Sequence, residues 1–342
     1  MELHEELADL AAEHGVRLGV ADLSPFPDQQ RDIEDRVTTG LSASLKFTFG
    51  DPELATNPLL SFPWGRSIVV VAVPYLQDGD GPSKDRSVAR FADGDRYSRL
   101  RSVLGELSHH LAFHGARTEV VFDDNRLVDR AVAIRAGIAW PGKSTMAIAP
   151  GFGPWFLIGS IVTDAELPLS KPMGRTCGTC DACIPACPTG AIVAPGVLDA
   201  RRCLAAIFQS RGAIPTELRI AAGGRVYGCD DCLTSCPPGN RELGDHTASR
   251  TADPRDILVA SDSVLNEAYD HWYVPGRKMR FLRRNALVAL GNIGAANDVS
   301  LVEQYVEHQD PLLAEHAEWA RDRIVDRSSS TLNRPSLEIT EP

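Results

Sequence analysis

Three segments of the N-terminal half carry apolar residues at helical spacing. In residues 2–14, the leucines at positions 3, 7 and 10 fall on one side of a helix. Residues 97–114 repeat leucine or valine every three or four positions. A third helix is expected at residues 126–137, where Gly137 provides a stop signal.

Shorter apolar runs between these segments predict strands. Residues 67–75 form a valine-rich run without alternation, which is typical of a strand covered on both faces. Four further strands are expected, at residues 16–23, 117–122, 145–149 and 155–163. Helices that alternate with strands in this way indicate an α/β cofactor-binding domain over residues 1–165.

The remaining chain predicts two more domains and a tail, which together make an α+β multidomain protein. Residues 166–250 contain all the cysteines, and residues 251–327 are again patterned as helices that resemble a HEAT-type pair. One such pair cannot bury its apolar face alone, so we expect it to pack on the rest of the protein. Residues 328–342 contain Ser, Thr and Pro and are expected to be a disordered tail.

Composition narrows the class of protein. The chain has 342 residues, a hydrophobic content of 43% and a formal net charge of −11, which argues against indiscriminate nucleic-acid binding but leaves room for a local basic face. No apolar stretch is long enough to span a membrane. Residues 1–15 are charged and lack the apolar core of a signal peptide, so a cytoplasmic protein without a membrane partner is expected, and we expect it to be a monomer.

All eight cysteines lie between residues 177 and 236. The first four follow the spacing C-x2-C-x2-C-x3-C-P of bacterial ferredoxins, in which three close cysteines hold one iron–sulfur cluster and the fourth crosses to another. Cys203 completes the second cluster because it is the one thiolate left over. The pattern therefore predicts two [4Fe-4S] clusters, the first held by Cys177, Cys180, Cys183 and Cys236, and the second by Cys187, Cys203, Cys229 and Cys232.

Zinc and disulfide bonds are the alternatives for these cysteines. Thiolate sulfur also binds zinc, but two four-cysteine zinc sites would show paired C-x2-C units. The third closely spaced cysteine and the two Cys-Pro endings favour clusters. Disulfides are disfavoured because no signal peptide precedes them.

The sequence resembles the epoxyqueuosine reductase family of cobalamin-dependent iron–sulfur enzymes of tRNA modification. The similarity is strongest in CGTCDACIPACPTGAIVAPGVLDARRC (177–203) and GRVYGCDDCLTSCP (224–237), and includes AGIAWPGK (136–143) and WFLIGSIVTD (155–164). The resemblance implies an oxidoreductase in which an unidentified electron donor reduces the two clusters, which in turn reduce cobalamin. It also implies that the epoxide of a modified tRNA nucleoside is opened and converted to an alkene.

The resemblance places the proton donor at Asp123, with Asp129-Arg130 matching the family's Glu-Arg pair. A carboxyl group in an apolar pocket has a raised pKa and can donate a proton near neutral pH. The alternative for Asp123 is capping of the following helix, a role for which Asp124 competes.

The family places a loop beside cobalamin that corresponds here to Lys143, Ser144 and Thr145, and an ordinary polar loop is the alternative. Residues 137–144 also satisfy the phosphate-loop pattern G-x4-G-K-[ST]. That motif needs a strand before it and a helix after it, and the predicted order is the reverse. Trp155 is a candidate for a corrin contact, with a plain core position as its alternative.

Several family positions are changed in this chain, and its basic residues gather in one run. Ala55 replaces an arginine, Arg96 replaces an aspartate and Ser98 replaces a histidine, so the substrate need not be epoxyqueuosine. Two alternatives therefore remain: a reductase of the same architecture with another substrate, and a two-cluster electron-transfer protein without chemistry of its own. A solvated helix face is the alternative to RNA contact for the basic run, which consists of Arg277, Lys278, Arg280, Arg283 and Arg284.

Overall fold

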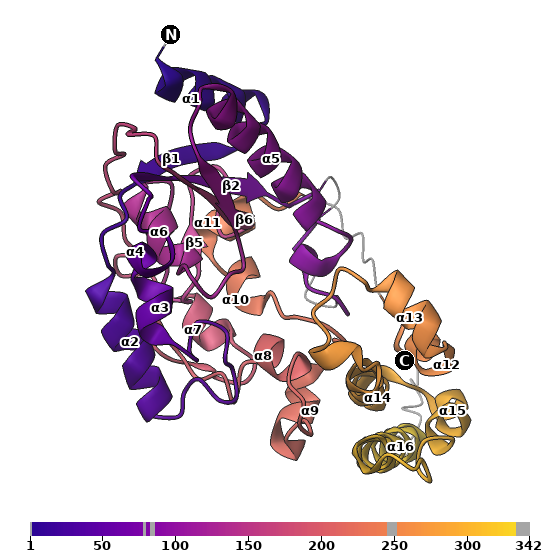
Figure 1. Ribbon diagram of the computed structural model, residues 1–342. Coiled ribbons are helices and arrows are strands. Elements are labelled where there is room, and N and C mark those ends of the chain that lie inside the picture. The colour runs from indigo at the N-terminus through magenta and orange to yellow at the C-terminus, as the bar shows by residue number, and fades with distance from the viewer. Residues whose placement is uncertain (1, 78–79, 83–85, 245–251, 333–342) are drawn as a thin grey trace, which may run out of the picture. The chain divides into compact units, whose positions relative to one another are not determined.

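The computed structural model describes residues 2–77, 80–82, 86–244 and 252–332 (Figure 1). The chain forms two compact units. The first contains Met1–Lys84, Arg90–Cys203 and Asp230–Ala248, and the second contains Asp85–Ala89, Leu204–Cys229 and Ser249–Pro342. The three-part domain layout with its boundaries at residues 165, 250 and 327 stays a prediction.

The first unit is built on a four-stranded sheet. Its order is β1 (Arg17–Ala21), β2 (Ser67–Pro74), β6 (Phe156–Thr163) and β3 (Thr118–Val121), and every neighbouring pair is antiparallel. The unit is therefore α+β, and the α/β assignment of this region was wrong. Alternation of helices and strands does not fix strand direction, because direction depends on which strands become neighbours.

Helices cover both faces of this sheet. Val69, Val71 and Val73 of β2 pack with α1 (Leu3–Glu13) and α5 (Tyr97–Phe113). Ile68, Val70 and Ala72 face the other way and pack with α6 (Asp129–Arg135). The strand is buried on both sides, as its continuous apolar run predicts.

Short elements around the sheet carry the candidate site. The sequence alone predicted a longer α6, but residues 125–127 form a turn and the helix begins only at Asp129. The remaining elements of this unit are α2 (Pro27–Thr38), α3 (Pro52–Thr56), α4 (Pro58–Ser61), η1 (Arg90–Ala92), β4 (Trp140–Pro141), β5 (Ala147–Ile148), α7 (Cys183–Ala186), β7 (Ile192–Ala194), β8 (Val197–Leu198), α10 (Asp231–Thr234) and α11 (Pro237–Arg241).

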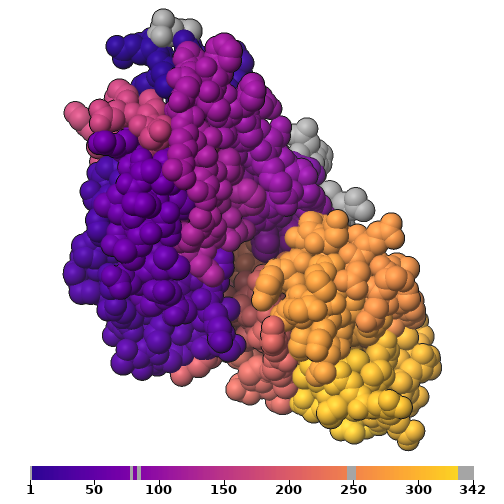
Figure 2. Space-filling view, in the orientation of Figure 1, coloured from indigo at the N-terminus to yellow at the C-terminus, as the bar shows by residue number. Residues whose placement is uncertain are grey.

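The second unit consists mainly of helices. Its C-terminal residues are coloured orange to yellow in Figure 2. Its central helix, α14 (Arg280–Ile293), packs against α16 (Pro311–Leu332), where Gly291 leaves no space for a Cβ beside Trp319. Their assignment to a HEAT-type pair stays a prediction. The other elements are α8 (Leu204–Phe208), α9 (Thr216–Ala222), α12 (Pro254–Val259), α13 (Asp262–Ala268), η2 (Pro275–Arg277), η3 (Ala296–Asp298) and α15 (Val299–Glu303).

The last helix extends beyond the expected start of the tail. Residues 328–332 continue α16, because the Ser328 hydroxyl donates to the Ile324 carbonyl and the Ser329 hydroxyl donates to the Val325 carbonyl. The prediction of a disordered tail from residue 328 was wrong for these five positions, and residues 333–342 lie outside the described part of the chain. Within that part, no helix is both long and apolar enough to cross a membrane.

Candidate active site

Four cysteines of the first unit gather around one point. Burial raises the pKa of the Cys183 thiol, and the nearby thiolates of Cys177, Cys236 and Cys180 raise it further. Burial likewise raises the pKa of Cys236, with Cys177 and Cys180 beside it. The chain therefore brings Cys236 to the three closely spaced cysteines, as the ferredoxin spacing predicts, and this donor set fits a [4Fe-4S] cluster.

Cys187, one of the cysteines assigned to the second cluster, directly follows α7. Although burial raises its pKa, Cys187 has a pKa below the usual value because Thr189 and the backbone of Ala191 donate hydrogen bonds to its sulfur. The Ala191 N–H lies 3.2 Å from the Sγ atom. Such bonds stabilise a thiolate ligand. No disulfide bond joins any of the eight cysteines.

A buried ion pair fixes the loop between two of the cysteines. The Arg90 guanidinium and backbone N–H both donate to the Asp230 carboxylate, at 3.0 and 2.8 Å. Asp230 lies between Cys229 and Cys232 in the sequence. Arg90 also lies 5.1 Å from the ring centroid of Trp155, and both side chains are almost fully buried. The sequence alone does not reveal the role of Arg90, because its partner Asp230 lies 140 residues further along the chain.

Trp155 supports the segment that follows Cys236. Its indole N–H donates to the Gly239 carbonyl at 2.8 Å, and Tyr75 packs edge-on against its ring. The side chain has no exposed surface. This position favours the core alternative for Trp155, and its contact with a cofactor stays a prediction.

The hairpin of β4 and β5 connects the first cysteine group to the rest of the unit. The Lys143 backbone N–H lies 3.5 Å from Cys177 Sγ, and the Lys143 ammonium donates to the Gly178 carbonyl at 2.9 Å. Ser144 is buried. No helix follows the motif, so the segment is a hairpin turn and not a phosphate loop.

Several residues of the first unit have strained backbone conformations, and one of them lies in this hairpin. Within the described residues of the first unit, four residues other than glycine have a positive φ: Ala43, Thr48, Asp123 and Thr145. The Thr48 N–H donates to the Asn125 side chain at 3.0 Å, which joins the loop of Thr48 to the loop of Asp123. Such strain costs about 1–3 kcal/mol per residue and is typical of active sites.

The carboxylates at Asp123 and Asp129 differ in their surroundings. Asp123 is exposed on the loop after β3. Burial raises the pKa of Asp129 well above its usual range, and the neighbouring charge of Asp123 raises it further. Asp129 Oδ1 is buried and has no hydrogen-bond partner within the described residues. Its neighbour Arg130 donates to the Thr145 carbonyl at 2.7 Å, which links this pair to the hairpin.

Asp124 has the structural role that competes with catalysis. Its carboxylate accepts hydrogen bonds from the backbone N–H and the guanidinium of Arg126, and those bonds hold its pKa below the usual range. Asp123 is therefore not needed as the cap of this turn, which leaves its side chain available for another role.

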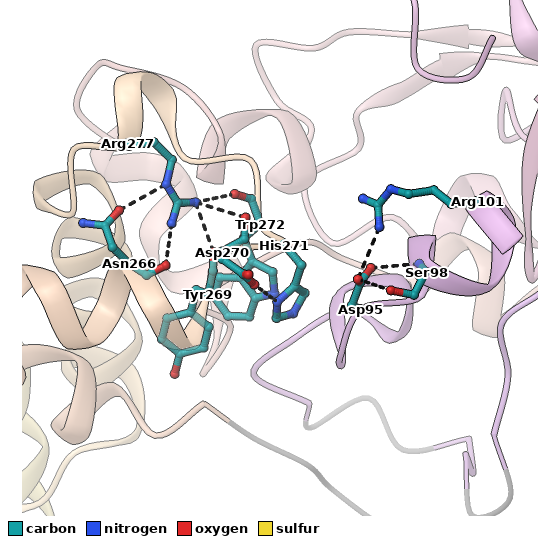
Figure 3. Close-up of polar contacts among 9 residues, drawn as sticks. All are labelled: Asp95, Ser98, Arg101, Asn266, Tyr269, Asp270, His271, Trp272 and Arg277. Carbon is teal, nitrogen blue, oxygen red and sulfur yellow. Dashed lines mark hydrogen bonds and ion pairs between the residues drawn. The ribbon is translucent and has the colours of Figure 1, made fainter. Parts of the chain in front are cut away.

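Two of the residues that depart from the family pattern, Arg96 and Ser98, lie at the start of α5. Asp95 accepts hydrogen bonds from the backbone and hydroxyl of Ser98, and its carboxylate lies 3.3 Å from Arg101 (Figure 3). Ser98 therefore helps to hold the start of the helix in place of the family's histidine. Ala55 is fully buried within α3, so no charged side chain projects from that position.

The prediction of RNA contact was wrong for Arg284, which has no exposed surface. Its guanidinium donates to the carbonyl groups of Ser210, Gly212, Ile207 and Phe208. A run of positive charge in the sequence does not reveal which side chains fold inward.

The other arginines of the run are also engaged within the second unit. Arg277 donates to the Asn266 side chain and to the Tyr269 and Trp272 carbonyls (Figure 3). Arg280 pairs with Asp310, and Arg283 pairs with Asp262. Lys278 is exposed. RNA contact by these four residues stays a prediction.

Two aromatic residues next to the basic run have different surroundings. Trp272 is buried and stacks between Tyr227 and Tyr269, with ring centroids 4.3 and 4.1 Å away. Tyr273 keeps 63% of its surface exposed. Only Tyr273 has an open ring face for a base.

Comparison with known proteins agrees with these features. A family model described as a 4Fe-4S double cluster binding domain matches residues 176–239. Epoxyqueuosine reductase of Bacillus cereus is 32% identical over 333 residues, which cover 90% of this chain and 85% of that protein.

Solved structures of epoxyqueuosine reductases are similar to this protein over nearly its whole length. One, of epoxyqueuosine reductase with an epoxyqueuosine-modified tRNA-Tyr stem loop, gives a TM-score of 0.84 at 29% identity and covers 96% of this chain and 92% of that one. The Streptococcus thermophilus enzyme gives a TM-score of 0.85 at 25% identity, with coverage of 95% and 91%.

The chain combines a 4Fe-4S double-cluster segment with an antiparallel α+β unit, and its relatives are reductases, so it is an iron–sulfur oxidoreductase. Within that class, this chain belongs to the epoxyqueuosine reductase family. The family resemblance stated from the sequence is confirmed. The comparisons favour neither the reductase with another substrate nor the electron-transfer protein without chemistry.

Proposed function

We propose that this protein reduces epoxyqueuosine in tRNA to queuosine, with electrons delivered through two [4Fe-4S] clusters to cobalamin. Conversion of an epoxide to an alkene with release of water consumes two electrons and two protons. The site must therefore place a proton donor near the end of an electron path.

One connected arrangement in the first unit carries this proposal. The cysteine quartet contacts Lys143 of the hairpin, the hairpin accepts a hydrogen bond from Arg130, and Asp129 lies beside Asp123. An electron source and a pair of carboxyl groups thus meet at one hairpin. The relatives act on epoxyqueuosine in tRNA, and one was solved with such a stem loop.

The hairpin residues Lys143, Ser144 and Thr145 would hold cobalamin. Their fit rests on the strained backbone of Thr145 and on the contact of Lys143 with Cys177, a predicted ligand of the first cluster. When bound, cobalamin supplies a metal centre that collects single electrons and delivers a pair to an epoxide carbon. The electron donor and the monomeric state stay predictions.

The two carboxyl groups divide the handling of protons. Asp129 keeps its proton to a higher pH than an ordinary carboxyl because it is partly withdrawn from water. In this proposal Asp123, which is exposed on the loop beside Asp129, is the group that protonates the leaving oxygen. Arg130 fixes the hairpin against this pair.

Matched substitutions of neighbouring aspartates test the proposal. With reconstituted clusters, added cobalamin and epoxyqueuosine-containing tRNA, Asp123→Asn should lower turnover by about 10²–10⁴-fold, the usual contribution of a general acid. Asp124→Asn should stay within a few-fold, since Asp124 only holds Arg126. Queuosine is measured in digested tRNA by mass spectrometry, and equal losses in both variants would contradict the assignment of Asp123.

A further inference from the structure

Two helices of the first unit bring three metal-ligating side chains together away from the cysteines. Glu6 lies on α1, His110 lies on α5 and His114 caps the end of α5. The two helices lie side by side (Figure 1), and their buried leucines share one core. The two histidines are four residues apart, so they project from the same helix face.

The donor atoms of these side chains already converge. Glu6 Oε2 lies 2.8 Å from His110 Nε2 and 3.0 Å from His114 Nε2, and all three donor atoms lie within 4.8 Å of one another. Donor atoms around a tetrahedral zinc ion with bonds of about 2.0–2.1 Å are separated by about 3.3 Å. The two separations from Glu6 would therefore have to grow by about 0.3–0.5 Å to admit an ion.

The cluster is open to solvent on one side. Glu6 and His110 are half-buried and His114 is exposed, so an ion can enter from solvent and keep a water molecule as a fourth ligand.

We propose that Glu6, His110 and His114 form a binding site for one divalent transition-metal ion, with zinc as its physiological occupant. Two imidazole nitrogens and one carboxylate oxygen are a zinc donor set, whereas magnesium and calcium prefer oxygen ligands alone. The bound ion fastens α1 to α5. None of the three residues belongs to the proposed active site, so this site is independent of the proposed function.

A second histidine–carboxylate pair joins the same two helices but does not form a metal site. His14, at the end of α1, lies 2.9 Å from Glu106 of α5. Only one histidine and one carboxylate meet there, so that pair forms an ion pair when His14 is protonated and offers too few ligands for zinc. Within the described residues, no third potential metal ligand lies close to His14 and Glu106.

Zinc titration of the full-length protein tests the proposal. The protein is reconstituted with its clusters, so that the cysteines are occupied, and is then passed over a chelating resin. Calorimetry should show one zinc ion per chain. His110→Gln and His114→Gln should each weaken zinc binding at least about tenfold, as expected when one ligand of three is lost.

His109→Gln is the matched control, because His109 is exposed on the same helix and lies outside the cluster. Its zinc affinity should stay within about twofold of the wild type, in the range of surface substitutions. X-ray absorption at the zinc edge should show nitrogen and oxygen ligands without sulfur. Sulfur ligands, or equal zinc affinity in all three variants, would overturn the proposal. Circular dichroism and cluster EPR spectra confirm that each variant is folded.

Discussion

At the scale of single residues, buried arginines stabilise loops by donating to several carbonyl groups at once. Arg284 lies under α8 and the residues that follow it, and no water can replace its hydrogen bonds. Removal of one donor leaves each former acceptor unsatisfied, which costs about 1–3 kcal/mol per group. Such a residue stabilises the fold mainly through its directed hydrogen bonds, and less through its charge.

Arg284→Gln should therefore lower the free energy of unfolding by several kcal/mol, on the order of 3 kcal/mol. Urea unfolding followed by circular dichroism measures the change. Lys278→Gln is the matched control from the same basic run, and it should change stability by less than about 0.5 kcal/mol because Lys278 is exposed. A stable Arg284→Gln protein that had lost only tRNA binding would restore the RNA-contact interpretation.

A buried histidine makes the stability of the second unit depend on pH. His316 has no exposed surface, its Nε2 atom accepts the Ile214 N–H at 3.1 Å, and its Nδ1 atom lies 2.7 Å from the Leu312 carbonyl. Burial, aided by the charge of Arg219, lowers the pKa of His316 to about 4. Between that value and its usual pKa near 6.5, the unfolded chain binds a proton that the folded chain does not.

The stabilising contribution of neutral His316 is thus complete above about pH 6.5 and is lost as the pH falls toward 4. At pH 5.5 the loss should be about 1 kcal/mol, since each pKa unit corresponds to 1.36 kcal/mol. The difference in urea midpoint between wild type and His316→Gln, measured at pH 7.0 and at pH 5.5, isolates this effect from acid damage to the clusters. A constant difference would mean that His316 is not neutral in the folded state.

At the scale of elements, some helices are too short to be stable alone and are held in place by long-range hydrogen bonds. Residues 237–241 form α11 directly after Cys236, and the Trp155 indole at the start of β6 donates to the Gly239 carbonyl. Gly239 itself cannot carry a Cβ, because that atom would lie 2.5 Å from the Leu233 carbonyl. The Trp155 hydrogen bond therefore holds the segment that directly follows Cys236, the predicted fourth ligand of the first cluster.

Trp155→Phe keeps an aromatic ring but removes the indole donor and so leaves the Gly239 carbonyl unpaired. We expect iron to be lost to a chelator several-fold faster than from the wild type, measured by the decay of cluster absorbance under anaerobic conditions. Trp64→Phe is the control, because Trp64 packs with Phe62 and Arg117 on another part of the sheet. Identical decay in both variants would separate Trp155 from cluster retention.

At the scale of the whole molecule, local patterns predicted the elements, and long-range contacts decided the rest. The cysteine spacing is a local signal, so the double-cluster segment was predicted correctly, and the apolar run of β2 was predicted for the same reason. The antiparallel strand order, the pairing of Arg90 with Asp230 and the burial of Arg284 depend on residues far apart in sequence. No periodicity encodes those contacts, and the charge run at residues 277–284 was therefore misinterpreted in part.

The distribution of charge over the molecule predicts how tRNA binding depends on salt. The chain has a net charge of −11, and the four arginines at positions 277, 280, 283 and 284 are engaged by carbonyl or carboxylate groups. This basic run therefore offers few cations that can release counterions from phosphates. The slope of log affinity against log salt should be no steeper than about −3, which corresponds to about four phosphate contacts.

Fluorescence anisotropy with a labelled anticodon stem loop, over about 50–300 mM KCl, measures this slope. Lys278→Gln should make the slope shallower by about 0.7–0.9, the contribution of one phosphate contact. Arg283→Gln should weaken folding while leaving the slope nearly unchanged, because its guanidinium is held by Asp262 and the Ala260 carbonyl. A slope of about −6 or steeper would instead require a large basic face, and affinity would then arise mainly from electrostatic attraction and not from recognition of the modified nucleoside.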